Sequence, residues 1–424
     1  MSVTILGGGI AGLSSAFYLA ARSSSKINVF EATSKLSGWM KSQQFDGYTF
    51  ESAARTLRPK GLTGNTTLEL IQMLELEDKI VPVKSDVRGK FRLIWSRSKA
   101  VTAVTPESDV QLKALFSSDD ATDHESIYDF TVRKFNKELA DNVISPMVSG
   151  ICAGDSKNIS AKFLVKGSKS EQFEQNDLYK KAQKERWNFY SLEGGIQALP
   201  NAIAEKLATM AQVSINVDSA CQKIHFKDDG TVEITVNDKV HITNFLISSL
   251  PGEKLAPLLE NQHPELAKEL NGMKALDVAM VNMHFKSDDL LKQKGFGVFV
   301  PASENSPVRG IIFDSCCFQM KGTTLTAMIG GPLGLTNDSN LLETSLQSVK
   351  EILDISESPD NSKVQILRKS FPQYVVGHYE RIDRIKNYIT SKNLPLSLCG
   401  QSFDGIGINE VILSAKIATH SVNF

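Results

Sequence analysis

The first glycines of the chain are spaced for binding a nucleotide pyrophosphate. They occupy the segment Gly7-Gly8-Gly9-Ile10-Ala11-Gly12, a Gly-x-Gly-x-x-Gly pattern. In such a pattern the first glycine permits a tight turn, the second lets the backbone approach the phosphates, and the third lets a helix pack closely on a strand. Glu31 lies nineteen positions after Gly12, where its carboxylate can accept hydrogen bonds from a ribose hydroxyl. These residues predict a dinucleotide site.

The elements around the glycines are those that such a site requires. Ser2 to Leu6 is predicted to be a buried parallel strand, Leu13 to Ala21 a helix, and Ile27 to Phe30 a second strand that ends at Glu31. The helix N-terminus would then face the phosphates and favour their negative charge. This pattern alone does not distinguish FAD from NAD, because both carry the same adenosine diphosphate.

The residues that follow resemble the flavin amine oxidase superfamily, which favours FAD. Ala32 to Trp39 is similar to the superfamily stretch after the ribose-binding glutamate, with Ser37-Gly38 in place of a Gly-Gly pair. Phe45 to Glu51 resembles the hairpin that precedes the flavin ring. Ala53-Ala54-Arg55-Thr56 then stands in place of a Gly-Pro-Arg turn, and alanine cannot adopt every backbone conformation open to glycine.

Longer segments narrow the resemblance to the protoporphyrinogen oxidase family of haem synthesis. The matching segments are 146–155, 191–200, 295–301, 371–378, 398–400 and 405–409, in family order. The resemblance implies an α/β fold of the amine oxidase and p-hydroxybenzoate hydroxylase type. Its parts are a Rossmann-like FAD-binding domain, a β-sheet substrate domain and a helical, membrane-associated subdomain.

The expected domains are discontinuous along the chain. We expect the FAD-binding domain from residues 1–81, 187–251 and 381–424, the substrate domain from 82–104 and 252–380, and the helical subdomain from 105–186. The substrate domain contains predicted strands at 278–285, 297–300, 310–313 and 325–329, with a helix at 341–353 on its outside. The helical part docks on a membrane in the family, but its segment 156–187 is short here.

The resemblance also indicates which residues contact the flavin. A terminal helix is predicted at 411–422, and its N-terminus, aimed at the N1 side of the ring, would stabilise reduced flavin. The residues expected to contact FAD are Gly7, Gly8, Gly9, Ile10, Ala11, Gly12, Glu31, Ala32, Trp39, Ala53, Ala54, Arg55, Thr56, Ala220, Gln401, Ile406, Gly407 and Ile408.

The implied substrate, protoporphyrinogen IX, is a large apolar macrocycle with two propionates, so its pocket needs apolar walls and one or two cations. Arg55 and Arg92 are the expected carboxylate partners. Phe296, Gly297, Phe299 and Met328 match positions that line the ring, with glycine expected where a side chain would occupy the space of the macrocycle. Without the family, ordinary core packing explains Phe299 and Met328 equally well, and Arg92 on a strand edge is commonly just solvated.

The implied reaction is three successive two-electron hydride transfers to flavin, with O2 as acceptor and H2O2 as product. No residue is assigned as acid or base, since orientation against the flavin would carry the catalysis. Two alternatives stay open. One is a related FAD-dependent amine oxidase or carotenoid-type desaturase, and the other is a catalytically inactive flavoprotein scaffold.

Composition excludes several other classes of protein. Lys and Arg total 47 against 48 for Asp and Glu, so the basic excess typical of nucleic-acid binding is absent. The five cysteines show no Cys-x-x-Cys spacing, and no metal site or disulfide framework is expected. The glycines begin at position 7, which leaves no room for a cleavable presequence before the fold. Resemblance alone implies a peripheral protein of the mitochondrial inner membrane, on the intermembrane-space side, as a homodimer with possible contact to ferrochelatase.

Overall fold

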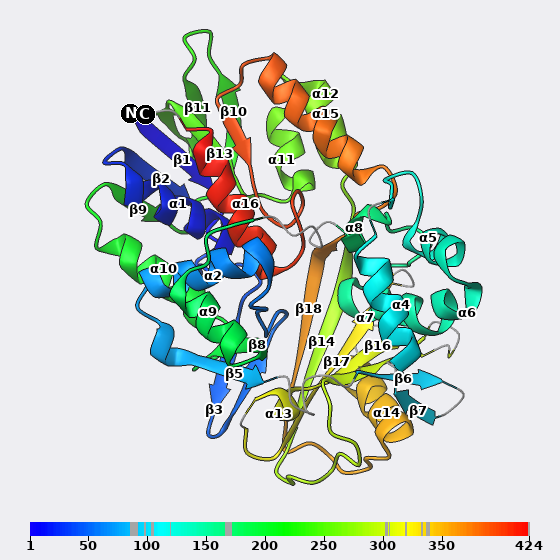
Figure 1. The fold of residues 1–424 in the computed structure, drawn as a ribbon. Coiled ribbons are helices and arrows are strands. Elements are labelled where there is room, and N and C mark those ends of the chain that lie inside the picture. Colours follow the sequence, from blue (N-terminus) through cyan, green and yellow to red (C-terminus); the bar gives the residue numbers. More distant parts are fainter. Residues whose placement is uncertain are drawn as a thin grey trace.

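The fold is that of a computed structural model of the full chain (Figure 1). The structure describes residues 1–422 except 85–91, 97–98, 103–105, 119, 166–171, 302–303, 305, 319, 332–333 and 336–339. For residues 84, 92–96, 99–102 and 106–109 the structure describes the backbone but not the side chains.

A five-stranded parallel sheet forms the base of the nucleotide-binding part, in the order β19-β13-β1-β2-β9. Its strands are β1 (Ser2–Leu6), β2 (Lys26–Phe30), β9 (Val213–Asn216), β13 (Phe245–Ser248) and β19 (Leu396–Leu398). All four pairings are parallel. These strands come from three distant stretches of the chain, because parallel neighbours require crossover connections.

Helices cover one face of this sheet and share an apolar core with it. They are α1 (Ile10–Arg22), α2 (Gly61–Met73), α9 (Asp177–Lys184), α10 (Ala198–Ala208) and α16 (Ile408–His420). Ten consecutive residues of α1 are buried, since this helix lies between the sheet and α16 in Figure 1. Two short antiparallel pairs flank these helices: β3 (Ser42–Phe45) with β4 (Tyr48–Glu51), and β5 (Ile80–Lys84), after the short η1 (Glu77–Lys79), with β8 (Trp187–Leu192).

The other face of the sheet carries a second core. It includes β10 (Cys221–Phe226), β11 (Val232–Val236), β12 (Lys239–Thr243), α11 (Gly252–Leu259), α12 (Pro264–Asn271) and α15 (His378–Ser391). Leu6, Phe30 and Leu246 of the large sheet pack in this core with leucines of α11 and α12.

A seven-stranded, mostly antiparallel sheet forms the second large unit, in the order β18-β14-β17-β16-β15-β6-β7. Its strands are β6 (Arg92–Ser96), β7 (Lys99–Thr102), β14 (Ala275–Phe285), β15 (Gly297–Phe299), β16 (Val308–Phe313), β17 (Thr323–Gly330) and β18 (Asn361–Pro372), with the short α13 (Asp314–Cys317) after β16. Side chains alternate between the faces along each strand. Ala279 and Val281 of β14 enter the core under α14 (Leu341–Leu353), whereas Val278 and Met280 face the opposite side.

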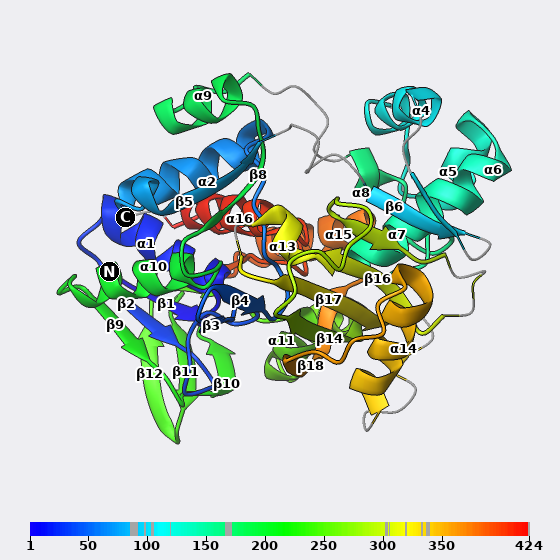
Figure 2. The ribbon, with the colours of Figure 1, turned by 90° about the horizontal axis from the view of Figure 1, so that it is seen from below.

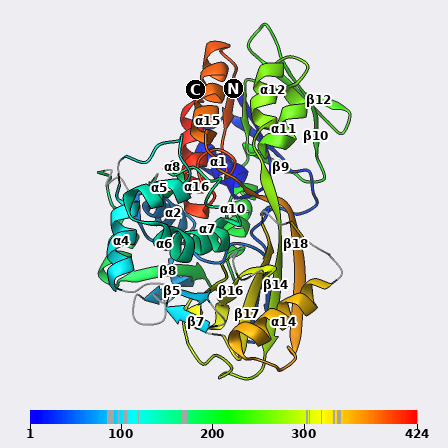
Figure 3. The same cartoon turned by 90° about the vertical axis from the view of Figure 1, so that its right-hand side faces the viewer.

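Short helices cover the end of that opposite face. They are α4 (Pro106–Phe116), α5 (Ile127–Lys134), α6 (Lys137–Leu139), the π-helical η2 (Ala140–Ile144), α7 (Ser145–Cys152) and α8 (Lys162–Val165). Figures 2 and 3 show these cyan and green helices on one side of the sheet and α14 on the other. Within the described residues, no helix is both long and apolar enough to cross a bilayer.

The packing differs from the expected division of the chain in two places. The helix α9, expected in the helical subdomain, packs on α2 and places Leu178, Tyr179 and Ala182 in the core of the nucleotide-binding part. The helices α11 and α12, expected in the substrate domain, also pack on the nucleotide-binding part. In both cases the apolar face of an amphipathic helix, rather than its position along the chain, decides where it packs.

Candidate functional site

The glycine turn between β1 and α1 has the geometry of a pyrophosphate cradle. A Cβ on Gly12 would lie 1.8 Å from the carbonyl oxygen of Gly7, and Gly7 itself has a φ of +103°. Both positions therefore require glycine for the backbone alone. A Cβ on Gly9 would meet nothing nearer than the Cα of Gly38 at 3.8 Å. Gly9 caps α1 without a side-chain hydrogen bond, which leaves the helix N–H groups for an anion.

Glu31 lies beside this turn, at the end of β2. Its Oε2 accepts a hydrogen bond from the N–H of Gly8 at 2.7 Å, and its Oε1 accepts from the N–H of Thr33 at 2.9 Å. The N–H of Ser219 donates to the carbonyl of Glu31 at 2.8 Å, which brings the segment of the exposed Ala220 alongside the carboxylate. The expected adenosine residues thus share one edge of the sheet, where Ala32 is also exposed.

Ser37, which stands where the superfamily has glycine, adopts a glycine-like conformation. Its φ is +82°, a region in which a side chain is strained. Its N–H donates to the carbonyl of Gly8 at 3.0 Å, so the strained turn holds the chain against the pyrophosphate cradle. The Ser37 hydroxyl is buried with no hydrogen-bond partner among the described residues. The indole of Trp39 is 38% exposed.

The hairpin β3–β4 places the buried carboxylate of Glu51 before the Ala53-Ala54 turn. Glu51 accepts hydrogen bonds from the N–H of Ile196 at 2.8 Å and from the hydroxyl of Ser42 at 2.7 Å. Burial raises the pKa of Glu51 to about 7, and these two hydrogen bonds act in the opposite direction. Glu51 was not predicted to be a functional residue, because nothing in the sequence around it indicates that its side chain is buried.

Arg55 forms a buried ion pair instead of reaching an open pocket mouth. Its Nη1 lies 2.7 Å from Oδ1 of Asp314, and each side chain is 4% exposed. Its Nη2 donates to the carbonyl of Ala53 at 3.2 Å, and the hydroxyl of Thr326 donates to the other Asp314 oxygen at 2.6 Å. Burial raises the pKa of Asp314, against the attraction of the guanidinium. The expectation that Arg55 awaits a substrate carboxylate therefore needs correction, since Asp314 already occupies it.

The inner face of the seven-stranded sheet carries an apolar row beside this ion pair. The register aligns Phe299, Gly310, Met328 and Met280 across four neighbouring strands. Met280 and Met328 belong to a buried cluster against which Ala53 of the flavin turn packs. This contact places the apolar row directly beside the expected position of the flavin ring.

A polar row runs beside the apolar row on the same face. Thr326 aligns with Asn282 on β14 and with Ile312 on β16. The amide of Asn282 donates to the hydroxyl of Thr326 at 2.8 Å and to the carbonyl of Glu51 at 3.1 Å. This face of the sheet is therefore apolar along one row and hydrogen-bonded to the flavin hairpin along the next.

Three of the expected ring-lining residues have different surroundings from those anticipated. A Cβ on Gly297 would lie 2.4 Å from the carbonyl oxygen of Ile311, so glycine is required there by the neighbouring strand and not by a macrocycle. Phe299 packs with the short helices, against Gly150 of α7. Phe296 is half-buried beside Phe189, with ring centroids 5.1 Å apart. The backbone of Arg92 pairs with Gly297, whereas the side chain of Arg92 lies outside the described residues.

Gly310 lies on the same face of the sheet as Gly297, in the neighbouring row. A Cβ on Gly310 would approach the carbonyl of Val298 at 3.1 Å and the ring of Phe299 at 3.7 Å. Gly310 lies in the apolar row between Phe299 and Met328, so the row has no side chain at this position. Nothing in the sequence indicates this residue, because only the register of the sheet shows that Gly310 aligns with Phe299 and Met328.

The C-terminal turn and α16 approach from the other side. Gly407 caps α16 without a side-chain hydrogen bond, and Ile408 begins the helix. The side chain of Glu410 lies over Gly405 and Gly407, within 2.5 Å of the position of a Cβ on either glycine. This carboxylate in the first turn offsets the positive helix end expected to favour reduced flavin. Ile406 packs with the short helices, and the amide of Gln401 donates to the carbonyl of Ser370 at 3.3 Å.

The residues at the glycine turn and at the end of β2 fit the pyrophosphate and ribose of FAD. The open approach at Gly9 with the uncapped N-terminus of α1 suits the pyrophosphate, and Glu31 at the end of β2 suits the ribose. Ala53, Ala54 and Thr56 are only half-buried, and Ala53 packs against the cluster of Met280 and Met328, beside which the ring would lie.

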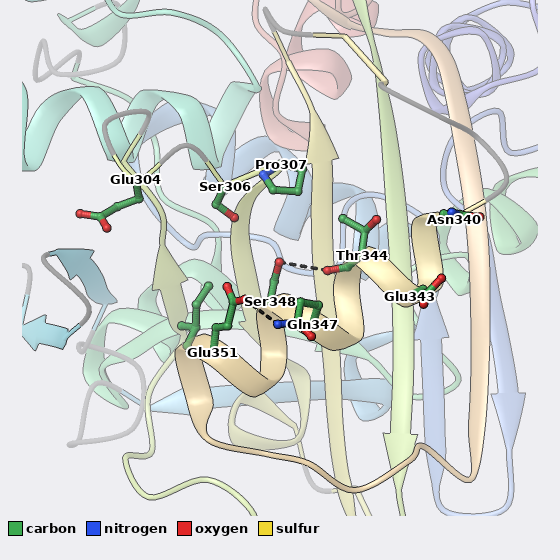
Figure 4. Close-up of a pocket in the computed structure, with 10 residues that line it drawn as sticks. Glu304, Ser306, Pro307, Asn340, Glu343, Thr344, Gln347, Ser348 and Glu351 are labelled. Atoms are coloured by element: carbon green, nitrogen blue, oxygen red, sulfur yellow. Dashed lines mark hydrogen bonds between the residues drawn. The ribbon is translucent and has the colours of Figure 1, made fainter.

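A separate pocket on the outside of the molecule has a different character (Figure 4). It lies along α14 and is lined by the carboxylates Glu304, Glu343 and Glu351 among polar groups. The amide of Gln347 bonds to Glu351 at 2.6 Å. The helix α14 lies on the face of the sheet opposite the apolar row, so this acidic pocket is not part of the candidate site.

Comparisons with known proteins find chains similar to this one over nearly its whole length. The chain is 27% identical to protoporphyrinogen oxidase of Bos taurus over 99% of the chain and 98% of that protein. It is 25% identical to coproporphyrinogen III oxidase of Bacillus subtilis over 98% of the chain and 96% of that protein. A crystal structure from Exiguobacterium sp. 255-15, provisionally named a protoporphyrinogen oxidase, superposes with a TM-score of 0.78 at 21% identity, covering 99% of this chain and 98% of that one.

The family model described as flavin containing amine oxidoreductase matches residues 10–423. The match covers α1, the flavin hairpin, the seven-stranded sheet, four of the five strands of the parallel sheet and α16. The chain belongs to the flavin-containing amine oxidoreductase family, and its cofactor is FAD.

Proposed function

We propose that this flavoprotein oxidises protoporphyrinogen IX to protoporphyrin IX in three two-electron steps, with O2 as the final acceptor. The observation that carries the proposal is the apolar row Phe299–Gly310–Met328–Met280, which lies beside Ala53 and thus next to the expected flavin ring. The end-to-end similarity to protoporphyrinogen oxidases supports the same substrate.

Bound FAD would supply hydride acceptance and electron transfer to O2. Each step removes two electrons and two protons from the macrocycle, so three O2 become three H2O2 for each porphyrin formed. The chain contributes orientation: the apolar row holds the ring face, and the Arg55–Asp314 pair fixes the carbonyl of Ala53 in the flavin turn. Glu51, with a pKa of about 7, can hold a proton beside this turn at neutral pH.

The test is an initial-rate comparison on the purified, FAD-loaded protein. We expect turnover of protoporphyrinogen IX, followed by porphyrin fluorescence, and no oxidation of putrescine or a carotenoid. Coproporphyrinogen III serves as a third substrate, because relatives that act on it are also similar to this chain. The matched control is Gly9→Asp, which should lack flavin. Turnover of the amine or the carotenoid in place of the porphyrinogen would refute the proposal, as would flavin-loaded protein that is inert toward every substrate.

Location and assembly are proposed on resemblance alone. We propose peripheral association with the mitochondrial inner membrane on the intermembrane-space side, through the short helices α4–α8, as a homodimer with possible contact to ferrochelatase. Fractionation of mitochondria with carbonate extraction tests the first proposal, and light scattering of the purified protein tests the second. Recovery in the matrix fraction, or a monomer at micromolar concentration, would contradict them.

A further inference from the structure

Arg309 is a buried cation that forms no ion pair with any of the described residues. It lies on β16, where the register shifts between Val308 and Gly310, and its side chain is 2% exposed. Within the described part of the chain its one hydrogen bond joins Nε to the carbonyl of Gly330 at 3.1 Å. A guanidinium has five N–H donors, so both terminal nitrogens stay without a partner among the described residues.

The arrangement is costly unless something else satisfies the guanidinium. Burying an unpaired charge is strongly unfavourable, and buried arginines are normally paired. Burial lowers the pKa of Arg309, but a guanidinium stays protonated at neutral pH. The contrast with Arg55 is direct, because the equally buried Arg55 has Asp314 at 2.7 Å.

Arg309 lies at the rim of the apolar row. The next residue, Gly310, is the centre of that row. A Cβ on Gly331 would lie 3.9 Å from Nε of Arg309 and 2.7 Å from the carbonyl of Ala153. Ala153 in turn packs in the cluster with Met280 and Met328. The cation is therefore at one edge of the surface on which the macrocycle would lie.

We propose that Arg309 binds a carboxylate of the porphyrinogen substrate and is the residue that selects acidic macrocycles. The proposal rests on the proposed function and assigns to Arg309 the role that the sequence suggested for Arg55. The hydrogen bond from Nε to Gly330 holds the guanidinium plane in place, so the two terminal nitrogens can receive a carboxylate in the bidentate manner.

The experiment compares wild type with Arg309→Leu, in FAD-loaded form, on protoporphyrinogen IX and on its uncharged dimethyl ester. Loss of a charge-assisted hydrogen bond should raise KM for the diacid about 10- to 100-fold. The value for the ester should change less than about 2-fold, because the ester has no charge to lose. The KM of Arg309→Lys for the diacid should lie between those of wild type and Arg309→Leu, because the ammonium of lysine cannot bind a carboxylate in the bidentate manner. The control is Arg384→Leu, the same chemical change at an arginine that is 52% exposed on α15, where no change is expected.

A second readout separates binding from a purely structural role. Removing an unpaired buried charge should raise the melting temperature of Arg309→Leu, whereas an arginine needed for the fold would lower it. A lower melting temperature, or the same diacid-to-ester KM ratio in wild type and variant, would overturn the assignment while leaving the proposed function intact. Wild type that oxidises neither macrocycle would instead refute the proposed function, and this assignment with it.

Discussion

The buried pair Arg55–Asp314 gives the sharpest test of how the flavin turn is held. In Asp314→Asn the side chain keeps its shape but loses its charge, so the guanidinium of Arg55 loses its counter-ion at a site where each partner is 4% exposed. Removing one partner of a buried pair costs about 3–5 kcal/mol, because the other charge stays buried and uncompensated. Asparagine can still accept from the hydroxyl of Thr326, which bonds to Asp314 at 2.6 Å, so we expect about 3 kcal/mol.

The assay is urea unfolding at saturating FAD, followed by circular dichroism and by flavin fluorescence. A double variant, Arg55→Met with Asp314→Leu, removes both charges and should recover most of the loss. The flavin absorption of Asp314→Asn should also shift, because Nη2 of Arg55 bonds to the carbonyl of Ala53 at 3.2 Å. A loss below about 1 kcal/mol in Asp314→Asn, or a double variant no more stable than Asp314→Asn, would refute the reasoning.

The remaining predictions concern the cofactor turn and the hairpin. Gly12→Ala should prevent folding, since its Cβ would lie 1.8 Å from the carbonyl of Gly7; Gly9→Asp should fold, by circular dichroism, but purify without flavin. Ser37→Gly should raise stability by about 1 kcal/mol in urea melts by relieving the positive φ, and a lower stability would show that its hydroxyl has a role. Glu51 binds its proton more tightly when folded, with a pKa raised from 4.5 to about 7. Its contribution to stability is therefore full below pH 4.5 and is lost, by about 3 kcal/mol, as the pH rises through 7. Glu51→Gln should remove that pH dependence.

Local patterns predicted the elements that hold the cofactor. The strand before Gly7, the helix after it and the strand ending at Glu31 are present, with α1 extending to Ile10–Arg22. The helix predicted at 341–353 matches α14, and the terminal helix begins at Ile408, three residues earlier than expected. These predictions succeed because glycine spacing and side-chain periodicity are local properties of the sequence.

The candidate site was harder to predict, because its residues meet only through the tertiary register. Arg55 and Asp314 are distant in the chain, and nothing near either one signals a buried pair. Gly310 was missed for a similar reason, since only the register shows that it shares a row with Phe299 and Met328, whereas Gly297 lies in the neighbouring row on the same face. Nothing in the sequence indicated that Arg309 is buried or functional, because an arginine beside a strand is usually solvated.

The proposed oxidation of protoporphyrinogen IX is tested most directly by its stoichiometry. Purified, FAD-loaded protein is incubated aerobically with protoporphyrinogen IX, and porphyrin fluorescence is followed together with H2O2, against a flavin-free Gly9→Asp control for spontaneous oxidation. We predict about three H2O2 for each porphyrin formed, as two-electron steps to O2 require. Porphyrin formation no faster than in the control, or without matching H2O2, would contradict the account.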